Sequence, residues 1–297
     1  MTLAAPTVHP WAEAIDRVEV CGAAAWVDGA PIDLKAGGDM ARRELGRALY
    51  AAFHVRGSAE DRVQADERYC SALERLHVRE TVRELGWEPV AELPEDRLKV
   101  RRGGEHLVVP RASMCDGRLL APAVRWRWTQ GYAAFLSEAG LPRHPSFRLY
   151  VNAGPVELAE MLPGLLRGLE ARNARYLVKT ANNPRTLLRR ADGTIVYVEA
   201  GDARWAVEQV SGAAQDGRLR TPCSLLARRL APGLSLAMEP TGGAGKWSFG
   251  THRARVLADW LLAPDGESLG TALERAGIDP DRPHLERGVA DPVGDDG

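Results

Sequence analysis

Phe147-Arg-Leu-Tyr-Val-Asn152 and Tyr176-Leu-Val-Lys-Thr180 are two short segments in which apolar side chains alternate with polar or charged ones. A period of two is typical of β-strands that bury one face. Arg148 and Tyr150 share one face of the first segment, whereas Lys179 interrupts the apolar run of the second. A lysine inside a half-buried strand either extends its amine to solvent or stands in a polar pocket where a base is needed.

Further strands and helices are predicted around this pair. The Asp192-Gly193 turn signal precedes a third strand at residues 194–198. Helical spacing predicts three helices, and a further strand follows the second of them. The helices cover residues 156–171, 202–214 and 248–262, and the strand covers residues 234–238. The predicted fold class is α+β, with an antiparallel-sheet core flanked by helices.

Three regions are predicted along the chain. Residues 1–97 are expected to be a mostly helical N-terminal region, because apolar residues recur there at helical intervals. At Leu98 the period changes to two, so a sheet-containing core is expected over residues 98–264. Residues 265–297 form an acidic tail rich in Pro, Gly and Asp, which we expect to be partly disordered.

The Arg125-Trp-Arg-Trp128 segment of the core has two interpretations. An extended conformation would place both tryptophans on one face and both arginines on the other. The segment is then either an edge strand that packs its tryptophans or a guanidinium-lined groove for a peptide.

Composition and charge narrow the function classes. A chain of 297 residues with 45% hydrophobic content can bury a substantial core, and a net charge of −1 argues against bulk binding of nucleic acid or anionic membranes. The charge is uneven, because residues 143–255 carry 17 Lys and Arg against 9 Asp and Glu, whereas residues 265–297 carry 3 against 9. The middle of the chain is therefore the expected host of an anionic ligand.

The scattered cysteines and the N-terminal sequence predict a soluble cytoplasmic protein. Cys21, Cys70, Cys115 and Cys223 lie far apart and show no metal-ligand spacing. No signal-like segment is present near the N-terminus, and no apolar run approaches the ~20 residues of a membrane span. We expect no metal, no membrane partner and no nucleic-acid partner.

Two motif look-alikes are set aside. Gly242-Gly-Ala-Gly-Lys-Trp-Ser248 lacks the first glycine of a phosphate-binding loop and has Trp247 where Ser or Thr is required. Gly266-Glu-Ser-Leu-Gly270 matches a hydrolase nucleophile elbow but follows a helix rather than a strand. Ser268 is instead expected to cap a helix.

Cationic and hydroxyl-bearing residues of the basic segment remain as candidates for chemistry. They are Arg148, Tyr150, Lys179, Arg189, Arg190, Tyr197, Arg228, Arg229, His252, Arg253 and Arg255. Arginine suits a phosphate dianion because its fork donates paired hydrogen bonds and keeps its charge. Surrounding positive charge and partial burial favour the neutral amine of a lysine, which can then act as a base.

Five ordered blocks within the core resemble the HopA-type type III effector family. They are residues 147–152, 177–180, 190–197, 230–240 and 248–253. Relatives of this family occur beside a kinase-like protein in actinobacterial clusters for class V lanthipeptides and thioamitides. There the kinase phosphorylates Ser and Thr of a precursor peptide, and the HopA-like partner eliminates phosphate to leave dehydroalanine or dehydrobutyrine.

The resemblance implies a function and a set of partners. The function is a phosphoserine/phosphothreonine lyase without an organic or metal cofactor, acting on a phosphorylated ribosomal precursor peptide. The implied partners are that peptide and a kinase-like protein, with a cyclase as a further candidate.

A second likeness concerns the phosphothreonine lyases. Arg148-Leu-Tyr150 and Val178-Lys-Thr180 are similar in placement to two of their strands. In those enzymes a lysine on the second strand removes the α-proton and a histidine on the first protonates the leaving group. The likeness implies that Lys179 is the base, but Tyr150 stands in the place of the histidine, so the general acid is either Tyr150 or His252.

The remaining site residues follow from these resemblances. The phosphate-binding candidates are Arg148, Arg189, Arg190, Arg253 and Arg255, and the substrate-binding candidates are Asn152, Tyr197 and Arg229. Two alternatives to the lyase stay open. One is a non-catalytic effector-type module that binds a phosphorylated or acidic partner, and the other is a subunit that presents the peptide to the kinase.

Overall fold

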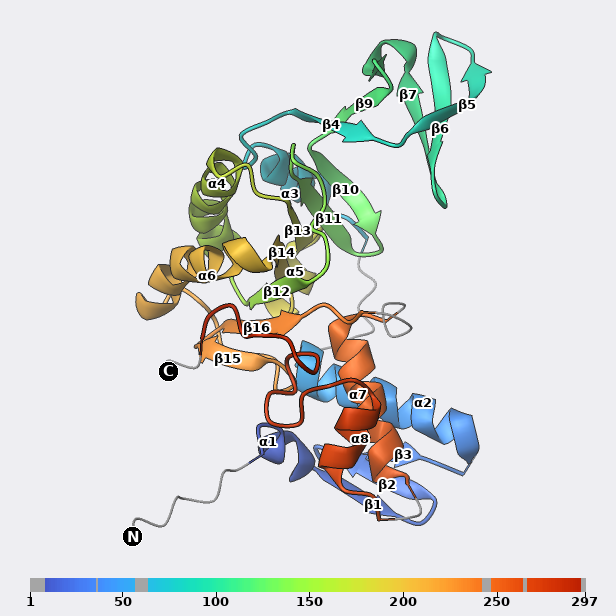
Figure 1. The fold of residues 1–297 in the computed structure, drawn as a ribbon, viewed down its shortest axis with the longest axis vertical. Helices are drawn as coiled ribbons and strands as arrows, with labels where there is room; N and C mark the ends of the chain where they lie inside the picture. Colours follow the sequence, from blue (N-terminus) through green and yellow to red (C-terminus); the bar gives the residue numbers. More distant parts are fainter. Residues whose placement is uncertain (1–8, 36, 57–63, 242–246, 264–265, 295–297) are drawn as a thin grey trace.

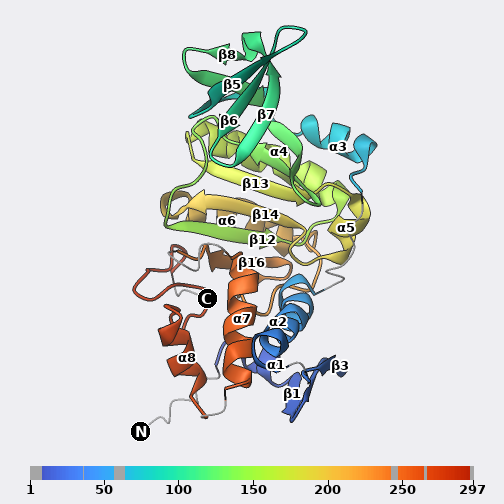
Figure 2. The same cartoon turned by 90° about the vertical axis from the view of Figure 1, so that its right-hand side faces the viewer.

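A computed structural model of the chain describes residues 9–35, 37–56, 64–241, 247–263 and 266–294. Its centre is a seven-stranded sheet in which every neighbouring pair is antiparallel, in the order β10-β11-β13-β14-β12-β16-β15. The strands are β10 (Val124–Thr129), β11 (Tyr132–Leu136), β12 (Ser146–Val151), β13 (Tyr176–Ala181), β14 (Thr194–Glu199), β15 (Arg228–Ala231) and β16 (Leu234–Met238). This sheet and its flanking helices confirm the predicted α+β class (Figure 2).

Helices α4 (Pro155–Ala171) and α6 (Ala200–Gln215) cover one face of the sheet (Figure 1). Phe147, Leu149 and Val151 of β12 are fully buried in the core cluster that these helices complete. Because side chains alternate across a strand, Arg148 and Tyr150 must point to the opposite face. The predicted helix at residues 156–171 runs through Pro163 without a break.

The opposite face carries α2 (Gly38–Leu49), its π-helical continuation η1 (Tyr50–Val55) and α7 (Phe249–Leu261). Apolar side chains of these helices share one core cluster with Tyr150 and Tyr197 of the sheet. Helices α2 and α7 lie side by side next to the β16 end of the sheet (Figure 2). The second face is therefore where helices far apart in the sequence meet the strands that carry the candidate residues.

The N-terminal region contains more strand than we expected. Three short strands form a sheet between α1 (Ala12–Ile15) and α2, and α3 follows at Glu67–Glu74. These strands are β1 (Val18–Cys21), β2 (Ala24–Val27) and β3 (Ala30–Asp33). The turn between β2 and β3 has φ values of 55° at Asp28 and 75° at Gly29, a hairpin geometry that Asp-Gly favours. Four-residue strands are too short for their alternation to stand out from the helical pattern.

A separate β-rich unit projects from the body of the molecule, as Figure 1 shows. It contains two three-stranded sheets, in the orders β4-β9-β8 and β5-β6-β7, around a small core that includes Trp87, Val100 and Leu119. The strands are β4 (Thr81–Leu85), β5 (Glu88–Leu93), β6 (Arg97–Arg102), β7 (Glu105–Pro110), β8 (Met114–Cys115) and β9 (Arg118–Pro122), with a 3-10 turn, η2, at Arg111–Ser113. The change of period at Leu98 therefore marks the middle of this unit, and the central sheet begins later, at β10.

Strand β10 is an edge strand, as one interpretation of its Arg-Trp repeat required. A register shift between Arg125 and Thr129 sends the two tryptophans to different core clusters, so they do not share a face. The Arg125 guanidinium pairs with Glu84 at 2.8 Å and lies 5.2 Å from the centre of the Trp128 ring. It is therefore engaged within the chain.

The acidic C-terminal region is folded over residues 266–294, where we expected partial disorder. It forms α8 (Leu269–Arg275), whose first turn is capped by Ser268 as predicted, and then returns to the core. The Asp291 carboxylate accepts hydrogen bonds from Arg228 at 2.6 Å and from His284 at 2.7 Å. The Asp291–Arg228 ion pair therefore joins the acidic C-terminal region to the basic segment of the core.

The described residues contain neither a membrane-spanning helix nor a cluster of metal-binding side chains. No helix in this part of the chain is long and apolar enough to cross a membrane. No group of three or more His, Cys, Asp or Glu side chains in the same residues is placed to hold a metal ion. The glycine-rich look-alike at residues 242–246 lies outside the described residues.

Candidate active site

Lys179 and Arg148 point to the same face of the central sheet. Strand β14 separates β12 from β13, and its Tyr197 pairs in register with Arg148 on one side and Leu177 on the other. The Lys179 Nζ lies 5.2 Å and the Arg148 Cζ 4.9 Å from the centre of the Tyr197 ring. Both distances are within cation–π range, so both cations contact the same aromatic side chain. The two side chains therefore share a face of the sheet, which is one condition of the base-and-anion-pocket hypothesis.

Arg148 is buried, and so is Tyr150, two residues further along the same face of β12. The Nε of Arg148 donates a hydrogen bond to the Glu239 carboxylate, which fixes the guanidinium against the sheet. The Tyr150 hydroxyl has no hydrogen-bond partner among the described residues. Burial raises the pKa of Tyr150 well above its usual value, against the opposing effect of Arg148. The phenol is therefore protonated at neutral pH and has a proton to donate.

Arg190 and Asp192 add a second buried ion pair on the loop that leads into β14. Arg190 donates from Nε to Oδ1 at 2.8 Å and from Nη2 to Oδ2 at 2.9 Å, a bidentate pair that leaves its other N–H groups for further partners. The Tyr50 hydroxyl lies beside them, and its burial raises the pKa of Tyr50 to about 12, helped by Asp192 and opposed by Arg190. The ring of Tyr132 lies 5.8 Å from the Arg190 Cζ.

His54 is a member of this cluster that we did not predict. It lies one π-helical turn after Tyr50, and its ring contacts Tyr150 edge-on with 4.8 Å between ring centres. Its Nδ1 is 2.8 Å from the Ser224 Oγ. Burial lowers the pKa of His54 to about 4; Asp192 opposes this shift, and Arg148 and Arg190 add to it. The imidazole is therefore neutral at neutral pH and positions Tyr150 rather than carrying charge.

A signal for His54 was present in the sequence. Tyr50 and His54 are spaced i, i+4, so on a helix they would share one face. The helix prediction for residues 39–55 used only the apolar residues, so it did not include this polar pair.

Arg253 directs its guanidinium donors to the folded C-terminal region, and the ring of His252 faces Arg253. The buried Arg253 guanidinium donates to the carbonyl oxygens of Pro283 at 2.8 Å and Leu285 at 3.1 Å, and its Nη1 is 2.6 Å from the His252 Nδ1. Burial and the neighbouring Arg253 lower the pKa of His252 to about 4. The structure thus gives these two residues partners in the chain that hold the C-terminal region in place.

The other predicted residues are dispersed. Arg189 is exposed at the end of α5 (Pro184–Arg189), and Arg229 is exposed on the edge strand β15. Asn152 is buried past the end of β12 and donates from Nδ2 to the Pro222 carbonyl at 2.9 Å. The cluster therefore brings together Lys179, Arg148, Tyr150, Arg190 and Tyr197 of the predicted set.

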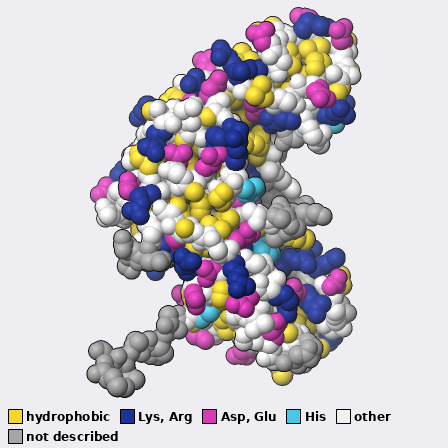
Figure 3. Space-filling view, viewed as in Figure 1, with side chains coloured by type: hydrophobic (Ala, Val, Ile, Leu, Met, Phe, Trp, Pro, Cys, Tyr) yellow, Lys and Arg dark blue, Asp and Glu magenta, His cyan; other side chains and the backbone are white. Residues whose placement is uncertain are grey.

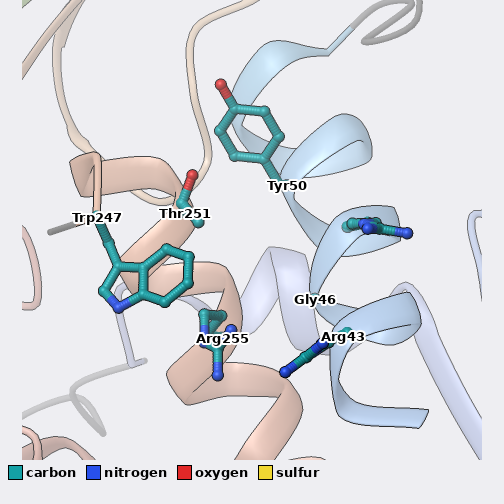
Figure 4. Close-up of a pocket in the computed structure, with 7 residues that line it drawn as sticks. Arg43, Gly46, Tyr50, Trp247, Thr251 and Arg255 are labelled. Carbon is teal, nitrogen blue, oxygen red and sulfur yellow. The ribbon is translucent and has the colours of Figure 1, made fainter. Parts of the chain in front are cut away.

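A cavity of about 490 Å³ opens between α2 and α7, next to this cluster. It is lined by Arg43, Gly46, Arg47, Tyr50, Trp247, Thr251 and Arg255. Figure 4 shows Arg43 and Arg255 at one end and the Tyr50 and Thr251 side chains at the other. The Arg255 guanidinium stacks on Trp247, with 4.5 Å from Cζ to the ring centre. In Figure 3 basic side chains gather over α2 at the rim of a hollow in the surface.

Tyr50 joins the cavity to the cluster. It lines the cavity, and its hydroxyl is the group that lies beside Arg190 and Asp192. The Tyr50 side chain therefore lies between the cavity and the sheet residues of the cluster.

Comparison with known proteins identifies relatives of this fold. The sequence profile of the HopA1 effector protein family matches residues 124–285. Among solved structures, the effector protein from Pseudomonas syringae pv. tomato strain DC3000 is similar, with a TM-score of 0.50 and 17% sequence identity over 85% of this chain and 92% of that chain. The effector protein from Pseudomonas syringae pv. syringae strain 61 has a TM-score of 0.48 and 17% identity over 82% of this chain and 91% of that one. A search of curated proteins gives no match. The matched region begins at β10 and contains the whole central sheet.

Proposed function

The chain belongs to the HopA1 effector protein family, and we propose that it is a phosphoserine/phosphothreonine lyase, like its relatives that occur beside a kinase-like protein. Its substrate would be a ribosomal precursor peptide that a separate kinase-like protein phosphorylates in the cytoplasm. The observation that carries the proposal is the placement of Lys179 and Arg148 on one face of the sheet, at 5.2 and 4.9 Å from the same Tyr197 ring.

The chemical roles follow from the surroundings of each side chain. The Lys179 amine takes the Cα proton of the phosphorylated residue as the general base. The Cα–Cβ double bond forms as the Cβ–O bond breaks, and phosphate departs. The products are inorganic phosphate and a dehydroalanine or dehydrobutyrine residue.

Arg148 and Arg190 are the proposed phosphate ligands. Asp192 and Glu239 orient them through hydrogen bonds to a minority of their N–H groups, so each guanidinium keeps donors that can serve the phosphate. With the Lys179 amine deprotonated, the two guanidinium groups and two carboxylates of the cluster balance, so Arg148 and Arg190 would bind the phosphate through their remaining N–H donors.

Tyr150 is the proposed general acid, in preference to His252. Its phenol is buried beside Arg148 and keeps its proton at neutral pH, whereas the Nδ1 of His252 faces Arg253. Tyr150 would protonate the bridging oxygen as the Cβ–O bond breaks. His54 then acts as a positioning residue for Tyr150.

A direct test uses synthetic phosphothreonine and phosphoserine peptides. Incubation with the wild-type protein should release inorganic phosphate and leave a peptide that has lost the mass of phosphoric acid, measured by mass spectrometry. A peptide that instead lost only the phosphoryl group would reveal hydrolysis and contradict the lyase. Binding without either mass change would favour the non-catalytic module.

A further inference from the structure

The cavity between α2 and α7 has an unusual balance of charge. Arg43, Arg47 and Arg255 line it, and none of the described residues that line it is acidic. Arg47 pairs with Glu44 at 2.8 Å on the surface of α2. Arg43 and Arg255 have no ion-pair partner among the described residues. Positive charge is thus left uncompensated at this place.

The other charged residues of α2 and α7 do not neutralise Arg43 or Arg255. On α2, Arg42 points elsewhere and pairs with Asp39 at 3.8 Å and with Asp259 of α7 at 3.6 Å. On α7, Arg253 is buried against the C-terminal region. The acids of the two helices are therefore used by Arg42 and Arg47, and none of them neutralises Arg43 or Arg255.

The cavity runs along one face of α2. Its α2 residues follow the spacing i, i+3, i+4 and i+7 from Arg43 to Tyr50, which is one face of a helix. At a rise of ~1.5 Å per residue, Arg43 and Tyr50 are about 10 Å apart along the axis. An extended peptide covers that length with about three residues. Trp247, which is 41% exposed, adds an apolar wall on the other side.

We propose that the cavity between α2 and α7 binds an acidic side chain of the substrate peptide, about three to five residues from the phosphorylated residue. Arg43 and Arg255 receive the carboxylate, Trp247 packs against the intervening chain, and Tyr50 lies on the side of the cavity nearest the cluster on the sheet. The inference rests on the proposed function, because it defines a second recognition element of the same substrate.

The test measures binding of labelled peptides by fluorescence anisotropy. One peptide carries a phosphothreonine in an otherwise neutral sequence. A matched series adds a single Asp at each position up to about six residues on either side. One further peptide keeps the best Asp and replaces the phosphothreonine with threonine. We expect one or two Asp positions on one side to tighten binding by about tenfold, and the unphosphorylated peptide to keep part of that gain.

Two variants and one control assign the effect to the cavity. Arg43→Ala combined with Arg255→Ala should abolish the gain from Asp and leave the affinity for the Asp-free phosphopeptide unchanged. Arg43→Glu alone should do the same, and because Arg43 is exposed it should not disturb folding. Arg167→Ala is the matched control, since Arg167 is an exposed arginine of α4 on the other side of the sheet.

Two outcomes would overturn the inference. The first is that no Asp position improves binding. The second is that the double variant lowers the affinity for the Asp-free phosphopeptide as much as the affinity for the Asp-containing peptides, which would mean that the cavity receives the phosphorylated residue itself. Failure of the lyase is a separate result: no phosphate would be released from any peptide by the wild-type protein, while binding that depends on Asp persisted.

Discussion

Substitution of Gly250 by alanine tests how tightly α7 holds His54 against Tyr150. A Cβ at position 250 would lie 2.2 Å from Cδ2, 2.5 Å from Cγ and 2.7 Å from Nε2 of His54. Non-bonded carbon atoms prefer ~3.5–4.0 Å, so the ring or the helix must move by about 1 Å or more. The ring cannot move freely, because it is buried among Tyr50, Tyr150 and Phe249.

The expected cost is the sum of three effects. Overpacking of a buried site costs about 1–3 kcal/mol. Loss of the hydrogen bond between His54 and Ser224 costs about 1 kcal/mol more. Alanine in place of glycine within a helix returns about 1 kcal/mol. Gly250→Ala should therefore lower the free energy of unfolding by about 1–3 kcal/mol and Tm by a few degrees.

Urea unfolding monitored by circular dichroism measures this cost. Gly212→Ala in α6 is the control, because nothing lies within 4 Å of its added Cβ and the variant should be slightly more stable than the wild type. In the His54→Ala background the further change Gly250→Ala should cost little, since the obstructing ring is gone. The reasoning is refuted if Gly250→Ala is as stable as Gly212→Ala, or if the effects of the two substitutions at positions 54 and 250 simply add.

Two further predictions concern pH and the C-terminal region. The pKa values of His54 and His252 are lowered to about 4 from 6.5, so their neutral forms contribute stability that is complete above pH 6.5 and is lost as the pH falls towards 4. Urea titrations should show a loss of up to about 1.4 kcal/mol per pH unit for each histidine, and a slope unchanged in His54→Gln would contradict this. Asp291→Asn should leave the buried His284 and the half-buried Arg228 without their carboxylate and lower stability by about 3 kcal/mol, with earlier proteolysis after residue 266. The exposed Asp281→Asn serves as control, and equal stability of the two variants would count against the role given to Asp291.

The central sheet was predictable because each of its main strands carries a local signal. Alternation identified β12 and β13, and the Asp192-Gly193 turn identified β14. Alternation also implied that Arg148 and Tyr150 share a face. It could not tell whether Lys179 faces the same side, because that depends on strand order and register, which are set by pairing across the sheet.

The parts of the site that come from elsewhere were not predictable in the same way. His54 reaches Tyr150 from nearly a hundred residues earlier in the chain, and the contact exists only because α2 and η1 pack on the sheet. Arg253 was predicted to be a phosphate ligand because the sequence does not show whether an arginine is free to bind a ligand or is bound to backbone carbonyl groups. Its partners, the carbonyls of Pro283 and Leu285, lie in a region whose composition indicated disorder.

Phosphate release by a Lys179→Gln variant tests the central claim most directly. Glutamine keeps the length of the side chain approximately and removes the basic amine, while Arg148, Arg190 and Tyr197 stay in place to bind the phosphopeptide. Lys99→Gln on β6 is the matched control, since Lys99 is an exposed lysine of the projecting unit. With a phosphothreonine peptide bound equally by all three proteins, we predict that Lys179→Gln releases at least about a hundredfold less phosphate per unit time than the wild type, whereas Lys99→Gln matches it. Release by Lys179→Gln at the wild-type rate would contradict the assignment of Lys179 as the base.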